Sequence, residues 1–505
     1  MSDTPHPASS DVGRLTGPSE TARRGAGNFT KMMAGRLAAQ AVLVVSALVI
    51  PAVLGAENYG HYAAVMAVIA IVQVLSSLGL NMVEIRHLAP MWRSEAREDA
   101  VVLGSTIWTT RALLSIAAGI VAAIWFGFSG DLVSGLAVWL FLSALAVIRS
   151  LFEATRSLFL PLGRVGTFVG LDLGRAALAL AVVTIGFTLA GIDAVFLAFP
   201  GAMTLLLVIT LALLVRAFPL RPGRFRWSAL SPHLGFSAAS FVATVSHMVQ
   251  LQFPIYLVAV YVARTEAGIL AFTLQIFSFL RGLFQGGLAS LMPILAEFDE
   301  RGDFDRLRLW GGMMMRYGAA ASCVTCVTWA FLGDLLLATL LPAEFAPVHH
   351  AATVILLAAA FSCCGGTCNA ILFIRQRAWL AAVNGVVYVA VAVVGVILVM
   401  EHGAAVTSSI CWIYVLATAI FFAGSYLALG LRARIWLPLR RTLLLIAPIA
   451  VAWLALGWDA SPIHKALAAA AFAAAYLLLA TLLRLLPLRE MSEIYATLTR
   501  PRVVL

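Results

Sequence analysis

The chain has 505 residues, of which 62% are hydrophobic and only 11% are charged, and its formal net charge is +10. So few charged residues cannot cover the surface of a water-soluble protein of this length, and the mean hydropathy of +0.97 is correspondingly high. The composition excludes a soluble globular protein. It predicts an all-α integral membrane protein, because a spanning segment must satisfy its backbone hydrogen bonds internally.

The N-terminal segment, residues 1–31, is rich in Ser, Thr, Pro, Gly and Arg and has no apolar run. Such a composition predicts a disordered tail. The first apolar run begins only near Leu37, too far from the start for a cleavable signal peptide. We therefore expect this run to be a permanent membrane span.

Crossing a hydrocarbon layer of roughly 30 Å takes about 20 apolar residues in a helix. Fourteen runs of the chain meet this requirement. They are residues 35–54, 60–83, 102–127, 132–152, 165–189, 193–215, 234–262, 267–293, 312–333, 348–374, 379–400, 404–430, 442–458 and 463–486. The last pair has an alternative interpretation, as one broken span and one surface helix.

Basic residues test this count independently, because Lys and Arg collect in cytoplasmic loops. Most of the 34 basic residues fall in alternate connections, within residues 14–36, 86–97, 149–164, 216–226, 301–316, 375–377, 432–441 and 484–502. The opposite connections hold Arg264 and Lys465 and are otherwise acidic. The alternation predicts an even number of spans with both termini cytoplasmic. The positive net charge then reflects the membrane topology of the chain. A nucleic-acid partner is therefore not expected.

Three arginines, Arg111, Arg175 and Arg281, fall inside predicted spans. A charge at that depth costs several kcal/mol unless it meets a partner or water. Arg175 can pair with Asp172, three residues earlier on the same helix face. The other two have no acid at i±3 or i±4, which leaves a partner on another helix or a water-filled cavity. Because one aspartate cannot neutralise three arginines, we favour a cavity that accepts an anion such as a phosphate.

The chain also contains a weak internal repeat. A shift of 208 residues places Gly60 on Gly268 and aligns the apolar runs that follow these glycines. Six predicted spans separate the two copies, so the repeat is parallel, as in one common plan of secondary transporters. In this register Gln73 corresponds to Arg281, and we expect these two residues to face each other across the pseudo-symmetry axis.

Several motifs resemble a known family. The segments LGAENYGHY and LGLNMVEIRHLA, with the later VARTEAGILAF and LMPILAEFDERGDFDRL, are similar to the polysaccharide transporter, or Wzx-type lipid-linked oligosaccharide flippase, branch of the MOP superfamily. That superfamily also includes MATE exporters and the lipid II flippase. The resemblance covers about residues 28–430 and implies two six-helix lobes. It further implies alternating access in the bacterial inner membrane, with an undecaprenyl-pyrophosphate-linked glycan moved to the periplasmic side for surface polysaccharide such as lipopolysaccharide.

The resemblance also implies a cationic cavity and a place for each part of the chain. Arg281 lies on the eighth span, where the family tends to carry such a cation, whereas the first span offers only Arg36 near its entrance. A polysaccharide polymerase and other assembly proteins are the implied partners. The expected parts are a cytoplasmic tail, an N-terminal lobe, a linker, a C-terminal lobe, an extra helix pair and a second tail, at residues 1–31, 32–216, 217–232, 233–430, 431–486 and 487–505.

The cavity walls need polar side chains for a sugar. Candidates inside the spans are Gln40, Gln73, His247, Gln250, Gln252, Tyr256 and Gln275. Each has the alternative role of a hydrogen bond between helices. Ion coupling would need a buried carboxylate, for which Asp172 and Glu153 are the candidates.

Other classes of function are less compatible with the sequence. The six cysteines all lie in predicted spans, where they act as small packing residues, and no P-loop is present, so we expect no metal, cofactor or ATPase activity. A MATE-like, cation-coupled drug exporter is the main rival, but it should carry acids where this chain carries arginines. A membrane glycan polymerase or ligase would need a larger outer loop than the longest one predicted, Asp334 to Val348.

Overall fold

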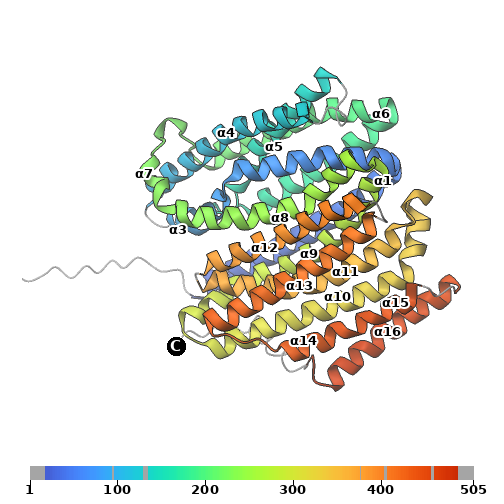
Figure 1. Cartoon of the computed structure of the whole chain (residues 1–505). Coiled ribbons are helices and arrows are strands. Elements are labelled where there is room, and N and C mark those ends of the chain that lie inside the picture. The colour runs from blue at the N-terminus through green and yellow to red at the C-terminus, as the bar shows by residue number, and fades with distance from the viewer. Residues whose placement is uncertain are drawn as a thin grey trace, which may run out of the picture.

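The computed structural model describes residues 18–93, 96–128, 135–375, 377–402, 406–456 and 460–486. Within these ranges every regular element is a helix, and most helices run roughly parallel to one axis (Figure 1). Twelve of the described helical segments are long and apolar enough to cross a membrane. The predicted all-α membrane fold is therefore confirmed.

The N-terminal half consists of four long helices and short connecting elements. In chain order these are α1 (Pro18–Ser77), α2 (Leu80–Val83), the π-helical turn η1 (Glu84–Leu88), α3 (Ala89–Arg93), α4 (Arg97–Phe128), α5 (Leu136–Ser157) and α6 (Val165–Ala217). A linker follows, with η2 (Pro222–Arg224), α7 (Trp227–Leu230) and η3 (Ser231–His233).

The C-terminal half consists of six long helices and a shorter terminal group. The six are α8 (Leu234–Tyr261), α9 (Arg264–Glu300), α10 (Phe304–Leu340), α11 (Val348–Ile374), α12 (Ala378–His402) and α13 (Val406–Ala433), with the turn η4 (Ala343–Phe345) before α11. The terminal group is α14 (Leu439–Ile446), η5 (Ala447–Ile449), α15 (Ala450–Leu456) and α16 (Pro462–Leu482).

Two of the long helices are each broken once. Gly55 interrupts α1 with φ 71°, and Ala190 and Gly191 interrupt α6, where Gly191 has φ 77°. Glycine has no Cβ and adopts positive φ at little cost, so the chain can turn sharply at these points. The breaks fall where the sequence predicts turns between spans, and the halves correspond to four predicted spans. Counted in this way, the described helices match all fourteen predicted spans.

The ends of the chain differ in part from prediction. α1 begins at Pro18, so residues 18–31 are helical although the sequence predicted a disordered tail there. Residues 1–17 and the predicted C-terminal tail, residues 487–505, lie outside the described residues. The final pair forms two segments, Leu439–Leu456 and Pro462–Leu482, that are each long enough to cross a membrane. The final helix pair therefore agrees with two membrane spans, and not with one broken span and one surface helix.

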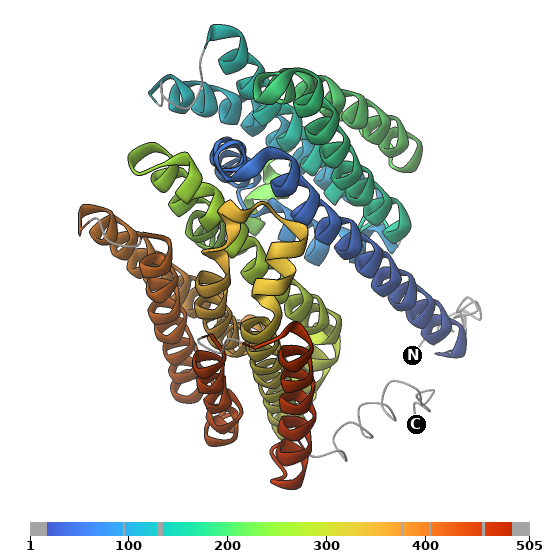
Figure 2. The ribbon, with the colours of Figure 1, turned by 90° about the vertical axis from the view of Figure 1, so that its right-hand side faces the viewer.

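The long helices form two groups that face each other. α1, α4, α5 and α6 lie together on one side, and α8 to α13 lie on the other, as the two perpendicular views show (Figures 1 and 2). We call these the N-lobe and the C-lobe. The lobes meet where α1 packs against α8 and α9, and the terminal helices α14 to α16 pack along α10 on the outside of the C-lobe.

The two glycines aligned by the internal repeat are in direct contact. A Cβ added to Gly268 would lie 2.0 Å from the carbonyl oxygen of Ala56 and 3.1 Å from the backbone nitrogen of Gly60. A Cβ on Gly60 would meet the carbonyl oxygen of Arg264 at 1.7 Å. The backbones of α1 and α9 therefore approach so closely that only glycine fits. This crossing joins the lobes at the end of the bundle that the charge pattern predicts to be periplasmic.

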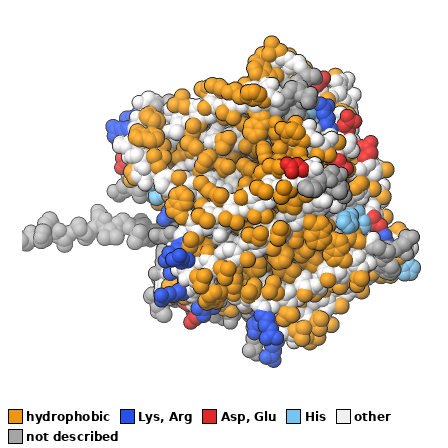
Figure 3. Space-filling model, in the orientation of Figure 1, with side chains coloured by type: hydrophobic (Ala, Val, Ile, Leu, Met, Phe, Trp, Pro, Cys, Tyr) orange, Lys and Arg blue, Asp and Glu red, His pale blue; other side chains and the backbone are white. Residues whose placement is uncertain are grey.

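Charged side chains are distributed unevenly along the bundle. In the space-filling view, basic side chains gather at one end and beside the start of the terminal helix group, and acidic ones lie mainly toward the other end (Figure 3). A broad apolar band separates the two ends. At the acidic end, Lys465 of α16 pairs with Asp334 of α10 at 2.5 Å. The distribution is the one expected for a helical bundle that spans a membrane.

The lobes also touch at the basic end. The rings of His87 in η1 and His233 in η3 lie 4.1 Å apart, and the guanidinium of Arg86 lies 4.6 Å from the centre of the Phe236 ring. Ser237 donates a hydrogen bond to the carbonyl of Leu78 at 2.5 Å. Burial first, then the charges of His233 and Arg86, lower the pKa of His87 below its usual 6.5.

We predict that this contact loses stability in acid. Because the pKa of His87 is lower in the folded protein, the unfolded chain takes up the proton first, and stability falls as pH drops through about 6.5. His87→Gln should flatten this dependence. The check is the thermal unfolding temperature of both proteins in detergent from pH 5 to pH 8. Parallel curves for the two proteins would contradict the prediction.

We also predict that Gly268→Ala destabilises the protein. The methyl group would collide with the backbone of α1, and overpacking of this kind typically costs about 1–3 kcal/mol. The matched control is Gly201→Ala in α6, where an added Cβ meets nothing within 4 Å. Thermal unfolding of the purified proteins measures the difference. An unchanged Gly268→Ala protein would show that the crossing adjusts at no cost.

Candidate functional site

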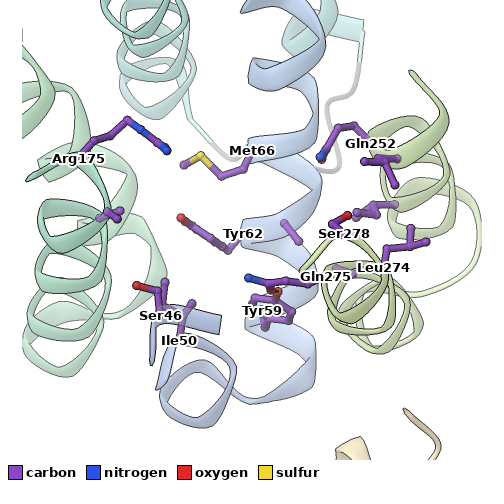
Figure 4. Close-up of a pocket in the computed structure, with 16 residues that line it drawn as sticks. Ser46, Ile50, Tyr59, Tyr62, Met66, Arg175, Gln252, Leu274, Gln275 and Ser278 are labelled. Atoms are coloured by element: carbon purple, nitrogen blue, oxygen red, sulfur yellow. Dashed lines mark hydrogen bonds between the residues drawn. The ribbon is translucent and has the colours of Figure 1, made fainter. Parts of the chain in front are cut away.

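A cavity of about 330 Å³ lies between the lobes, and we call it the central cavity (Figure 4). α1 and α6 of the N-lobe form one wall, and α8 and α9 of the C-lobe form the other. The lining residues are Ser46, Ile50, Tyr59, Tyr62, Ala63, Met66, Arg175, Ala176, Ala179, Leu251, Gln252, Ile255, Ala271, Leu274, Gln275 and Ser278. Figure 4 shows the side chains of Arg175 and Tyr62 on the N-lobe side, with Gln252 reaching in from the opposite wall.

A smaller cavity of about 210 Å³ adjoins the central cavity and adds a second arginine. Arg175, Tyr62 and Gln252 line both cavities, and Arg149 of α5 lines the smaller one. The Nη1 atom of Arg149 lies 3.4 Å from the sulfur of Met66. No carboxylate among the described residues lies within ion-pair distance of Arg149. Arg149 therefore faces a cavity without an ion-pair partner, and the nearest acid along its own helix is Glu153, one turn further on.

Arg149 lies inside a helix, whereas the sequence predicted it in a basic cytoplasmic loop. α5 continues to Ser157, two turns further on. The available signal was its position inside the predicted span 132–152. Arg316 was also assigned to a loop, yet it is buried within α10, where it donates to the carbonyl of Gly312 at 3.1 Å and to that of Leu485 at 3.4 Å. The described spans thus contain more arginines than the three predicted.

Arg175 has the partner that the sequence predicts. Its Nη2 lies 3.0 Å from an oxygen of Asp172, and the same oxygen lies 3.4 Å from Arg156. Arg156 in turn pairs with Glu153 at 2.8 Å. Both candidate coupling acids, Asp172 and Glu153, therefore belong to one chain of alternating charges. Arg175 at its end shares its charge between this network and the central cavity.

Arg111 lies away from the cavities and has a partner on another element. Its Nη1 donates to Glu84 at 2.9 Å and to the hydroxyl of Ser157 at 2.6 Å, and both charged side chains are buried. Glu84 directly follows the predicted span 60–83 and belongs to the π-helical turn η1, where its side chain is buried. Arg111 thus has a partner on another element, which is the alternative to a cavity that the sequence left open.

A third cavity, of about 710 Å³, lies toward the basic end of the bundle, and we call it the inner cavity. Arg281 of α9 lines it and lies 3.0 Å from Nδ1 of His247. Gln285, with its amide oxygen facing Arg281, accepts from Nε at 2.9 Å. Since a guanidinium only donates, His247 must be neutral with Nδ1 as the acceptor. No described carboxylate pairs with Arg281. It is therefore the second arginine that faces a cavity without an ion-pair partner.

Some of the predicted polar wall residues do line the central cavity. Gln275 of α9 accepts a hydrogen bond from the hydroxyl of Tyr59 at 2.8 Å, which joins the two lobes. Gln252 lines the central cavity from α8. Tyr62 was missed by the sequence analysis, since one aromatic residue in an apolar span gives no sign of which neighbour it faces.

Other predicted wall residues lie elsewhere. Gln250 is fully buried within the C-lobe and donates to the hydroxyl of Tyr388. Gln73 is half-buried and is absent from the lining of these three cavities, so a position opposite Arg281 stays a prediction. Tyr256 packs against the Trp125 ring at 5.3 Å. The side chain of Gln40 lies outside the described residues.

Acidic and metal-binding groups are scarce in these cavities. Among the described residues that line them, the one carboxylate is Asp299 in the inner cavity, and it pairs with Arg375 at 2.7 Å. The six cysteines are buried and free. The described part of the chain holds no group of three or more His, Cys, Asp or Glu arranged to bind a metal. The cavities therefore suit an anion better than a cation.

The sequence matches no protein-family model and no curated protein. Among solved structures, the chain is similar to the lipid II flippase MurJ in an inward closed conformation, with TM-score 0.67 and 11% identity over 90% of this chain and 98% of that one. An inward-facing multidrug resistance MATE family transporter of the MOP superfamily gives TM-score 0.65 and 12% identity, over 78% and 94% of the two chains. An outward-facing one gives a lower TM-score of 0.54, with 12% identity over 83% and 96%.

These likenesses establish the fold. The chain is a multi-pass membrane protein whose two lobes are arranged as in MATE transporters and MurJ. The higher TM-scores for inward conformations agree with the tight glycine crossing at the acidic end and the larger cavity near the basic end. At 11–13% identity the comparisons do not assign a substrate.

The buried pair predicts a specific pattern of stability. Arg111→Ala leaves Glu84 buried without its partner, which typically costs about 3–5 kcal/mol. The double variant Glu84→Leu with Arg111→Met removes both charges and should be close to wild type. Thermal unfolding and membrane expression level measure the effect. An Arg111→Ala protein that is as stable as wild type but inactive in transport would instead restore Arg111 as a substrate-binding residue.

Proposed function

We propose that the chain is a flippase that moves an undecaprenyl-pyrophosphate-linked oligosaccharide across the bacterial inner membrane by alternating access, for surface polysaccharide synthesis. The observation that carries this proposal is the pair of arginines, Arg149 and Arg281, that face cavities inside the membrane with no described carboxylate as partner. Arg175 also lines the central cavity, although its charge is partly neutralised by Asp172. A pyrophosphate would supply the missing negative charge.

The chemistry of the side chains supports an anion of this kind. A guanidinium in hydrocarbon costs several kcal/mol, so one without an ion-pair partner needs another interaction that compensates its charge. Its planar fork binds two phosphate oxygens at once, and in a site of low dielectric this replaces the hydration that a phosphate loses. Arg149 and Arg281 belong to different lobes, so one diphosphate could pass from one to the other as the lobes move.

The lining of the central cavity is chemically suited to bind a sugar. Its walls combine hydroxyl and amide groups with the rings of Tyr59 and Tyr62. Gln252 and Gln275 offer both donors and acceptors, which is the mixture that sugar hydroxyls need. This cavity lies between the lobes, where rocking of one lobe against the other would expose it to each side in turn.

A cation-coupled drug exporter is the second candidate, because several of the similar structures are MATE transporters. A cationic cargo would be attracted by an acid without a partner inside a cavity. The acids in and beside the described cavities, Asp299, Asp172 and Glu153, all pair with arginines. A glycan polymerase or ligase is less compatible, since the described connection between α10 and α11 is only residues 341–347. We therefore favour the flippase.

Further parts of the proposal follow from the charge pattern. An even number of spans, with basic residues at one end, supports cytoplasmic positions for both termini. A polymerase that uses the translocated glycan is the proposed partner. Asp172 and Glu153 remain the proposed acids for ion coupling, and protonation of either would break an existing ion pair.

We predict that Arg281→Ala and Arg149→Ala each lower transport by one to two orders of magnitude, since a hydrogen bond to a charged group is worth about 1.5–3 kcal/mol. Lysine at either position should restore part of the activity, because it keeps the charge and loses the fork. The measurement is surface polysaccharide in a deletion strain that carries each variant, together with flipping of the lipid-linked glycan in proteoliposomes.

The matched control is Arg306→Ala, which removes an arginine that is 64% exposed and pairs with Asp303 on the surface. It should transport like wild type. Normal polysaccharide in both cavity variants would refute the anion site. Loss of resistance to cationic drugs, with polysaccharide unchanged, would favour the exporter instead.

A further inference from the structure

A fourth cavity, which we call the apolar groove, lies between the lobes on the surfaces of α8 and α12. Its volume is about 430 Å³. Ile71 of α1 and Trp125 of α4 form its N-lobe wall. Ser246 is the one residue with a hydroxyl in its lining, and the others are apolar or aromatic. The groove therefore suits a hydrocarbon ligand.

The groove is open to the bilayer. The α12 wall consists of Val386, Val389, Ala390, Val393 and Val394, which share one helix face because they recur at spacings of three and four. Val386 is 50% exposed and Val394 is 55% exposed. A lipid chain could therefore enter sideways from the membrane without crossing the protein.

Aromatic rings bound the groove toward the acidic end of the bundle. Trp125 meets the Tyr256 ring edge-on at 5.3 Å, and Phe253 stacks on Tyr256 at 6.2 Å. Trp125 and Phe253 both line the groove. Tyr256 contacts Trp125 of the N-lobe and Phe253 of the C-lobe. The three rings therefore form a wall to which both lobes contribute.

The groove adjoins the inner cavity where α8 crosses α12. Ser246 lines both spaces, and on α12 Gly385 lines the inner cavity while the next residue, Val386, lines the groove. A Cβ on Gly385 would lie 3.4 Å from that of Ser246, so the helices pack closely at this point. The next residue of α8, His247, contacts Arg281. A cationic site and an apolar groove are thus only one residue apart along α8.

We infer that the apolar groove binds the polyisoprenyl chain of the translocated lipid while its pyrophosphate lies against Arg281. The inference rests on the proposed function and adds the site of the tail. An amphiphile with an anionic head and a long branched tail fits these two neighbouring spaces. Its head would lie at Arg281 in the inner cavity, and its tail would pass Ser246 and lie along the valines of α12. The occupant enters between α1 and α4 on one side and α8 and α12 on the other.

The groove would contribute mainly to specificity for the type of lipid tail, and less to binding affinity. A hydrocarbon chain gains little hydrophobic energy on moving from lipid to protein, because both surroundings are apolar. Packing of methyl branches against β-branched valines can still distinguish a polyisoprenyl chain from a straight acyl chain. The groove would therefore fix where the tail lies when the head enters the inner cavity.

The test uses the full-length protein in lipid nanodiscs and a polyisoprenyl pyrophosphate with a photoreactive diazirine in its tail. After illumination, labelled peptides are identified by mass spectrometry. We expect labelling of α8 and α12, centred on the groove residues. Ala390→Trp fills the groove and should lower this labelling roughly tenfold, because the tail loses its packing contacts with the valines of α12. Val393→Phe serves as a second, smaller obstruction.

The matched control is Ala117→Trp, an equally small and exposed position on α4 outside the groove lining. It should be labelled like wild type. Unchanged labelling in Ala390→Trp, or labelling mainly on other helices, would overturn the inference. Equal labelling of the groove by a diazirine phospholipid would overturn it too, because the groove would then hold ordinary bilayer lipid.

These outcomes separate the two proposals. If the groove variants transport normally while Arg281→Ala does not, the tail site is wrong and the flippase function stands. If the wild-type protein neither binds the probe nor flips a lipid-linked glycan, the proposed function fails and the tail site fails with it.

Discussion

The cost of placing a guanidinium in hydrocarbon constrains the rest of this structure. Each arginine deep inside a described span therefore needs compensation. Arg111 and Arg175 pair with acids, and Arg316 with backbone carbonyls. In the described part of the chain, the guanidinium of Arg149 lies against a thioether, and that of Arg281 lies against an imidazole and an amide. Both face cavities and have no ion-pair partner among the described residues, which is why we propose that they bind the substrate.

The cavities lie between two regions where the lobes are in contact, one at each end of the bundle. At the acidic end the backbones of α1 and α9 touch at Gly60 and Gly268, and a side chain on either residue would separate them. Toward the basic end the surfaces diverge around the inner cavity. Side chains also join the lobes beside this crossing, where the hydroxyl of Tyr59 donates to Gln275.

The three environments between the lobes divide an amphiphilic substrate among them. Cationic groups lie near Arg281 and Arg149, hydroxyl and amide groups line the central cavity, and valines line the apolar groove. A soluble cationic drug would use none of these fully. A lipid-linked glycan would use all three, with its head, sugar and tail each in a matching environment.

The sequence predicted the helical fold, the fourteen spans, the turns between residues 54 and 60 and between 189 and 193, and the pairing of Arg175 with Asp172. Each of these depends on local hydropathy or on spacing along one helix. Only the tertiary structure paired Arg111 with a carboxylate on another element and placed His247 beside Arg281. The reason is physical: periodicity along one helix fixes which residues share a face, but it does not fix which face of a distant helix that one meets.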